Sequence, residues 1–100
     1  MAKLREDIIQ EIKAYIEKHS GNYPNWYVGI ASDAEDRLFN DHEVDKVNDL
    51  WIYEKAENSE TAREIEGYFI DKLDTDGDTG GGDDKTKFVY AYKKNSHTTE

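Results

Sequence analysis

An arginine lies eight residues after a glycine that interrupts a strand-like run, and this spacing suits the binding of an anion. Residues 26–31 are aromatic and β-branched, which predicts a β-strand. Gly29 lies within this run, where its missing side chain allows a ligand or another backbone to approach closely. Ser32 and Glu35 form a capping box, which predicts a helix that carries Arg37 in its second turn. A strand with a glycine, joined to a helix with an arginine, is a common way of building a phosphate or carboxylate site.

A glutamate lies on the apolar face of a later helix. In the helix predicted for residues 60–73 the apolar side chains form one arc, and Glu66 falls inside it. An ionised carboxylate that faces a core is costly unless a partner compensates its charge. Two interpretations therefore remain open: a structural salt bridge to Arg37 or Lys72 at the rim of the core, or a metal ligand or catalytic carboxylate.

Six elements are predicted to position these residues, in the order helix, strand, helix, strand, helix, strand. They cover residues 3–19, 26–31, 33–42, 50–53, 60–73 and 88–92. Gly21 and Pro24 are expected to end the first helix, and Ser59 is expected to cap the third. The second helix is short, and it is the element that must bring Arg37 to the strand.

The connections between the strands predict the topology. Strands 26–31 and 50–53 are joined by a helix, so we expect them to run parallel with a right-handed connection. The last strand can then insert between them, antiparallel to both, or it can lie at an edge. The expected fold class is α+β: a small three-stranded mixed or antiparallel sheet flanked by three helices.

A single domain is expected over residues 1–94. Within residues 74–86 the chain is acidic and rich in glycine, which predicts a flexible loop, and residues 95–100 are expected to form a polar tail. Asp74, Asp76 and Asp78 resemble the start of a calcium-binding loop. However, Thr79 replaces the glycine that such a loop requires, so a specific calcium-binding site is not expected.

The segment from the glycine to the arginine resembles a known nuclease motif. Tyr27-Val28-Gly29, with Arg37 on the next helix, is similar to the second half of the motif of the GIY-YIG nucleases, and Ser-Asp-Ala-Glu-Asp-Arg-Leu is typical of their arginine helix. Residues 62–70 resemble the later helix that carries the family's metal-binding glutamate. Alignment on the Phe-Ile pair that follows assigns this role to Glu66. The resemblance covers about residues 26–73 and is moderately specific.

The first half of the motif is missing from its usual place. No strand precedes Tyr27, and the only substitute is the Phe-Val-Tyr segment that ends at Tyr90, as though the family's first strand had moved to the C-terminus. In this family the first strand lies between the other two. Tyr90 then replaces the missing tyrosine, although packing on the strand face is its other possible use. His42 is a secondary candidate, one residue later than the family's histidine or tyrosine, where Asp41 stands.

The resemblance implies a reaction and an alternative to it. In an active member of the family, Glu66 holds one divalent ion, Mg²⁺ or Mn²⁺, while Tyr27 or Tyr90 activates or positions water and Arg37 stabilises the phosphate charge. The expected function is therefore metal-dependent phosphodiester hydrolysis. The alternative is a non-catalytic binding or interaction module on the same scaffold.

The charge of the chain limits its partners. Thirteen lysines and arginines stand against 23 aspartates and glutamates, which gives a net charge of −10. Such a surface repels nucleic acid, so we expect weak nucleic-acid binding, with a protein partner as the other option. Lys85, Lys87, Lys93 and Lys94 either contribute to phosphate binding or protect an edge strand from aggregation.

The location of the protein is predicted from what the sequence lacks. It has no cysteine, which is compatible with a reducing compartment. No apolar run approaches the roughly 20 residues that a membrane span requires, and the first residues lack the apolar core of a signal peptide. A soluble, intracellular and cytoplasmic protein that does not bind membranes is therefore expected.

Overall fold

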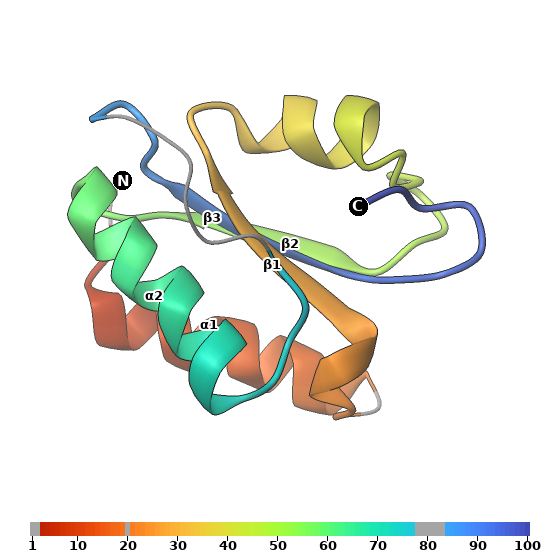
Figure 1. The fold of residues 1–100 in the computed structure, drawn as a ribbon, viewed down its shortest axis with the longest axis horizontal. Coiled ribbons are helices and arrows are strands. Elements are labelled where there is room, and N and C mark those ends of the chain that lie inside the picture. The colour runs from red at the N-terminus through yellow and green to blue at the C-terminus, as the bar shows by residue number, and fades with distance from the viewer. Residues whose placement is uncertain (1–2, 20, 78–83) are drawn as a thin grey trace.

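The computed structural model describes residues 3–19, 21–77 and 84–100, and its fold is α+β (Figure 1). Its elements are α1 (Arg5–Lys18), a short 3-10 helix η1 (Tyr23–Asn25), β1 (Trp26–Ala31), a π-helix η2 (Asp36–Asp41), β2 (Trp51–Lys55), α2 (Ser59–Lys72) and β3 (Phe88–Lys93). The order of the main helices and strands agrees with the prediction. Among the described residues, no helix is both long enough and apolar enough to cross a membrane.

The three strands form one sheet in the order β1-β3-β2, and β3 runs antiparallel to both neighbours. Consequently β1 and β2 are parallel to each other, and the predicted insertion of the last strand between them is confirmed. The register pairs Gly29 with Tyr90 and Tyr53 with Tyr90, so Tyr90 lies at the middle of the sheet. The interpretation of the nearby lysines as guards of an edge strand is wrong, because β3 has a partner on each side.

Alternation along the strands separates two apolar clusters, one on each face of the sheet. Helices α1 and α2 lie together on one face (Figure 1). Their cluster includes Ile8, Ile12, Trp26, Val28, Ile65, Phe69 and Val89. The segment that contains η2 covers the other face, where the buried residues are Tyr27, Ala31, Ala34, Leu38, Val44, Tyr90 and Tyr92. The tyrosines of β1 and β3 therefore face η2, whereas α2 packs on the opposite side.

The ends of the two long helices follow from local chemistry. Gly21 adopts a positive φ of 69°, and its N–H donates to the Ile16 carbonyl at 2.9 Å, which ends α1 as predicted. The expected cap of α2 is wrong by one residue. Asn58, rather than Ser59, has an extended backbone, and its Oδ1 accepts the Thr61 N–H at 2.8 Å. Ser59 is therefore the first helical residue.

Part of the predicted flexible loop, residues 74–86, is tied to the sheet. Asp76 forms a parallel bridge with Tyr27: its N–H donates to the Trp26 carbonyl at 2.8 Å, and its carbonyl accepts the Val28 N–H at 3.0 Å. Residues 78–83 lie outside the described residues.

The segment 95–100, expected to be a polar tail, also differs from the prediction. The Thr99 N–H donates to the His42 carbonyl at 2.8 Å, so this segment returns to the body of the domain. The contacts that hold it there are hydrogen bonds with residues far away in sequence, which a polar composition does not reveal.

Candidate functional site

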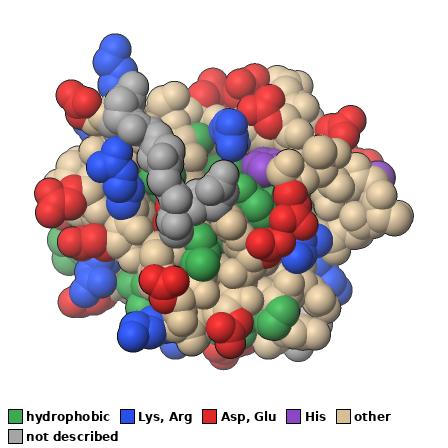
Figure 2. Space-filling view, in the orientation of Figure 1, with side chains coloured by type: hydrophobic (Ala, Val, Ile, Leu, Met, Phe, Trp, Pro, Cys, Tyr) green, Lys and Arg blue, Asp and Glu red, His purple; other side chains and the backbone are tan. Residues whose placement is uncertain are grey.

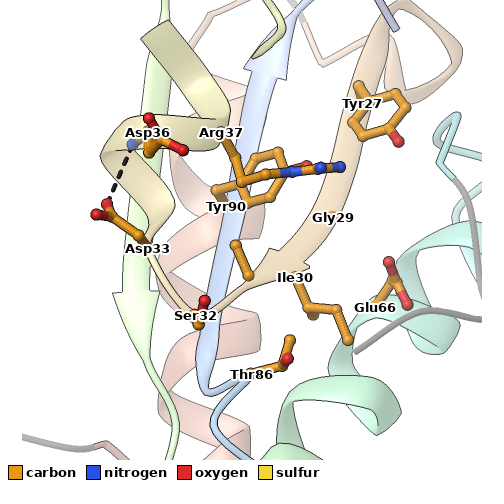
Figure 3. Close-up of a pocket in the computed structure, with 11 residues that line it drawn as sticks. Tyr27, Gly29, Ile30, Ser32, Asp33, Asp36, Arg37, Glu66, Thr86 and Tyr90 are labelled. Atoms are coloured by element: carbon orange, nitrogen blue, oxygen red, sulfur yellow. Dashed lines mark hydrogen bonds between the residues drawn. The ribbon is translucent and has the colours of Figure 1, made fainter. Parts of the chain in front are cut away.

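A pocket of about 290 Å³ lies beside Gly29 on β1 (Figure 3). Its lining includes five of the six residues selected from the sequence: Tyr27, Gly29, Arg37, Glu66 and Tyr90. The remaining candidate, His42, is buried and contacts Tyr90. The structure therefore places five of the six sequence-predicted residues around one pocket, although Arg37 and Glu66 reach it from opposite faces of the sheet.

The pocket collects side chains from both faces of the sheet. Arg37 belongs to η2 and Glu66 to α2, and these helices cover opposite faces. Figure 3 shows the Arg37 guanidinium extending over Tyr90, with Glu66 reaching the pocket from α2 on the other wall. They can line one pocket because β1 is an outer strand of the three-stranded sheet, so both helices reach past the same strand.

Gly29 makes room for a side chain. A Cβ atom placed at Gly29 would lie 2.5 Å from Oη and 2.6 Å from Cζ of Tyr90. The predicted close approach is therefore present, and the group nearest to Gly29 is the phenol of Tyr90 on the neighbouring strand. Since the two residues are register partners, the glycine allows the Tyr90 ring to lie flat across β1.

The segment that carries Arg37 is not the regular helix that the sequence predicts. The capping residue is Asp33, whose Oδ1 accepts the Asp36 N–H at 3.1 Å, so the predicted Ser32 cap is wrong. From Asp36 to Asp41 the bonding is of π type, as in the His42 N–H that donates to the Arg37 carbonyl at 2.8 Å. Turns of this type occur frequently at functional sites.

Arg37 is the cation of the pocket lining. It makes an ion pair with Asp41 at 3.3 Å, in which both side chains are about half exposed, so the pair contributes little to stability. Its interaction with the Tyr90 hydroxyl raises the pKa of the guanidinium. Asp33 and Asp36 also line the pocket, so the positive charge of Arg37 lies among carboxylates.

A chain of hydrogen bonds runs away from the pocket through Tyr90. The Tyr90 hydroxyl lies 2.7 Å from Nε2 of His42, and Nδ1 of His42 lies 2.7 Å from the Thr99 carbonyl. Because a carbonyl can only accept, Nδ1 must carry the hydrogen. In neutral His42 the other nitrogen, Nε2, is then an acceptor, and the Tyr90 hydroxyl donates to it.

Burial sets the protonation of both members of this chain. It lowers the pKa of His42, which favours the neutral imidazole near pH 7. It also raises the pKa of Tyr90, an effect that the nearby Arg37 opposes, so the phenol keeps its proton. The sequence indicated a buried face for His42 through its spacing from Ala34 and Leu38, but it gave no sign of Thr99.

Tyr27 belongs to an aromatic cluster behind the pocket. Its ring stacks on Tyr92 at a centroid distance of 5.3 Å and on Tyr90 at 6.3 Å, and it lies 4.7 Å from the His42 ring. Packing thus fixes the ring, and the residue still lines the pocket (Figure 3). Tyr27 is therefore placed to position a bound molecule with its hydroxyl.

Glu66 is a buried carboxylate, with 3% of the residue exposed. The salt bridge that the sequence left open, to Arg37 or to Lys72, is not among the ion pairs of residues 3–19, 21–77 and 84–100. In the same ranges no three His, Asp or Glu side chains form a group that could hold a metal. A single carboxylate nevertheless fits Mg²⁺, which keeps several waters and binds proteins through one or two carboxylates together with substrate phosphate.

The chain and its fold were compared with known proteins. Neither the models of protein families, nor the curated proteins, nor the solved structures match this chain. The functional assignment therefore depends on the residues of the pocket and their contacts.

Proposed function

We propose that this protein is a divalent-metal-dependent phosphodiester hydrolase, with its active site in the Gly29 pocket. The observation that carries the proposal is the shared pocket: Tyr27, Arg37, Glu66 and Tyr90 come from four different elements and line one cavity. Two independent sequence arguments, the helical arc and the resemblance to the GIY-YIG nucleases, had selected Glu66. The proposed location is cytoplasmic, in keeping with the absence of cysteine.

In this mechanism Tyr90 transfers a proton. Its oxygen takes a proton from an attacking water while its own proton passes to Nε2 of His42, 2.7 Å away. The water oxygen forms the new bond to phosphorus as the bond to the leaving oxygen breaks, and solvent protonates the leaving oxygen. Arg37 stabilises the negative charge that develops on the phosphate.

The other two residues, Glu66 and Tyr27, bind the metal ion and orient the attacking water in this mechanism. The Glu66 carboxylate holds Mg²⁺ or Mn²⁺, and the ion, when bound, neutralises phosphate charge. The Tyr27 hydroxyl orients the attacking water, while the stacking on Tyr92 keeps its ring in place. Since Tyr90 remains a neutral phenol, the route for its proton through His42 is necessary for base catalysis near neutral pH.

The charge of the protein favours a second candidate, a non-catalytic binding module on the same scaffold. The net charge is −10, and two aspartates line the pocket beside Arg37. Figure 2 shows acidic and basic side chains interspersed over one face of the molecule. Nucleic acid would therefore bind through few phosphate contacts and dissociate as salt rises, whereas a protein partner would not require a basic surface.

Cleavage of supercoiled plasmid at low ionic strength, with Mg²⁺ or Mn²⁺, tests the proposal. Wild-type protein is expected to nick the plasmid, and Glu66→Gln is expected to abolish nicking. Glu64→Gln is the matched control: it lies on the same helix, its side chain is 53% exposed, and its nicking should equal that of the wild type.

Two further variants test phosphate stabilisation by Arg37 and proton transfer by Tyr90 separately. Arg37→Ala should lower the rate by about a hundredfold, the effect of losing one donor to a developing anion. It should leave the fold intact, because Ala34 and Leu38 provide the buried contacts of this segment. Tyr90→Phe should lower the rate by at least about a hundredfold by removing proton transfer. If the wild type cuts no substrate with either metal, or Glu66→Gln cuts equally well, the binding module becomes the better description.

A further inference from the structure

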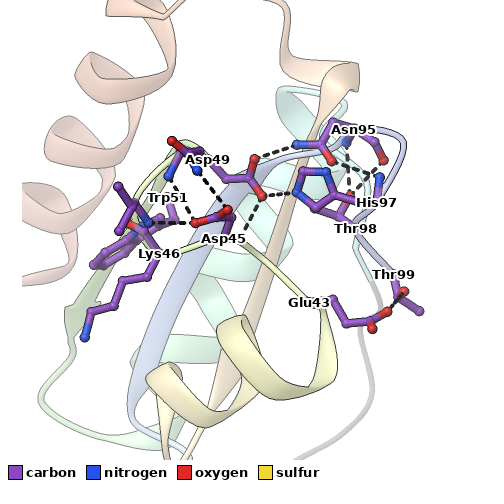
Figure 4. A network of polar contacts seen from close by, with 11 residues as sticks. Glu43, Asp45, Lys46, Asp49, Trp51, Asn95, His97, Thr98 and Thr99 are labelled. Carbon is purple, nitrogen blue, oxygen red and sulfur yellow. Dashed lines mark hydrogen bonds and ion pairs between the residues drawn. The ribbon is translucent and has the colours of Figure 1, made fainter.

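The segment 95–100 forms a structured turn that lies against the loop between η2 and β2 (Figure 4). The Asn95 N–H donates to Thr98 Oγ1 at 3.0 Å, and the Thr98 hydroxyl donates to the Asn95 carbonyl at 3.1 Å. The His97 N–H donates to Asn95 Oδ1 at 3.1 Å. These bonds lie within the turn itself, so it behaves as one unit that places the next residue, Thr99.

One carboxylate joins this turn to the rest of the domain. The Asp49 side chain is only 6% exposed, and it accepts hydrogen bonds from His97 Nε2 at 2.5 Å and from Asn95 Nδ2 at 3.0 Å. It also accepts the backbone N–H of Asp45 at 2.7 Å within its own loop. A buried carboxylate with three donors is both well satisfied and fixed in orientation, so Asp49 is a suitable anchor.

The docked turn brings the backbone of Thr99 against His42. The Thr99 N–H donates to the His42 carbonyl at 2.8 Å, and the Thr99 carbonyl accepts from His42 Nδ1 at 2.7 Å. These reciprocal bonds hold both the backbone and the ring of His42. The Tyr92 hydroxyl lies 3.1 Å from Nδ1 as well, but a hydroxyl can donate or accept and does not select a tautomer.

We propose that the segment 95–99 positions His42 in the candidate site, and that Asp49 and His97 are the positioning residues that dock it. With the Thr99 carbonyl in place, Nδ1 carries the hydrogen and Nε2 accepts from Tyr90. Without this carbonyl, the other tautomer becomes accessible, and it directs an N–H at the Tyr90 oxygen. The tautomer preference does not depend on the reaction, whereas its catalytic consequence rests on the proposed hydrolase function.

The ring nitrogens of His42 in ¹⁵N-labelled full-length protein provide a direct test. Above the pKa of His42, the wild type should show a protonated Nδ1 and an unprotonated Nε2. His97→Ala, Asp49→Asn and Thr99→Pro should each shift His42 toward a mixture of the two tautomers. Ser96→Ala is the control, because this exposed side chain lies in the same turn and should leave the spectrum of His42 unchanged.

Plasmid nicking by the same variants tests the catalytic consequence. His97→Ala should lower the rate by about tenfold to a hundredfold, the usual effect of removing a group that orients a histidine. A single Nδ1-protonated tautomer in all three variants overturns the proposal, even if the variants are less stable. If the tautomers shift as expected but the wild type cuts nothing, the positioning role stands and the hydrolase assignment fails.

Discussion

Replacing Gly29 by alanine tests the central contact of the pocket. The added methyl carbon would lie 2.5 Å from Oη, 2.6 Å from Cζ and 3.0 Å from Cε2 of Tyr90. Ordinary contacts between non-bonded carbon atoms are about 3.5–4.0 Å, so the overlap is roughly 1 Å. Tyr90 is 1% exposed, so a shift of its ring disturbs the closely packed side chains around it.

The cost has two parts. Overpacking a filled core costs about 1–3 kcal/mol. Movement of the ring also stretches its 2.7 Å hydrogen bond to His42, and a buried polar group left without a partner costs about 1–3 kcal/mol. We therefore expect Gly29→Ala to lower the free energy of unfolding by about 2–6 kcal/mol, with a fall in Tm of about 10 °C or more.

Urea unfolding of Gly29→Ala and of Gly67→Ala measures this effect against a matched control. A Cβ at Gly67, in the middle of α2, meets nothing within 4 Å. Gly67→Ala should therefore raise the free energy of unfolding by about 0.5–1 kcal/mol, the ordinary gain of alanine over glycine in a helix. In a Tyr90→Val background the cost of Gly29→Ala should largely disappear, because the obstructing ring is absent. Equal stability of Gly29→Ala and wild type would refute this reasoning.

Three other predictions concern the pH dependence of nicking, the pH dependence of stability and the edge of β1. Burial holds the pKa of His42 below its ordinary value of 6.5. The rate of nicking should therefore decrease as the pH is lowered, with a midpoint below 6.5, because Nε2 becomes protonated. The stability contribution of neutral His42 is complete above pH 6.5 and is lost as pH falls through the folded pKa, which urea unfolding at several pH values can follow. Gly77→Ala should lower the free energy of unfolding by about 1–3 kcal/mol, because its Cβ would lie 2.6 Å from the Val28 carbonyl oxygen, a backbone atom that cannot turn aside.

The fold could be predicted largely from the sequence because its strongest signals are periodic. The alternation in β3 places Tyr90 and Tyr92 on one face, and the rule of right-handed crossovers leaves a gap between two parallel strands that β3 fills. Capping was harder to predict, because Asn58 and Ser59 are both good capping residues and only the extended backbone of Asn58 decides between them. The π-type bonding after Asp36 leaves no mark on the apolar pattern, so a regular helix was expected there.

The site could be predicted only in part. Gly29, Arg37 and Glu66 stand out through local spacing or through a conflict between charge and position. The partners of His42 do not, because Tyr90 and Thr99 lie 48 and 57 residues away from it. The segment 95–100 has no apolar residue, and it binds through a turn and a buried carboxylate, which are visible only once the chain has folded.

Tyr90 connects these observations, and this connection distinguishes two kinds of defect. Gly29 gives its ring space, His42 accepts its proton, and the docked segment 95–99 orients His42. Variants at Gly29 and His97 should therefore share a disturbed His42 spectrum while retaining the Glu66 carboxylate. Glu66→Gln should remove the carboxylate and leave the spectrum of His42 unchanged, because α2 packs on the other face of the sheet and does not contribute to the bonds of His42. The two groups of variants thus separate loss of proton transfer from loss of metal binding, even before any substrate is identified.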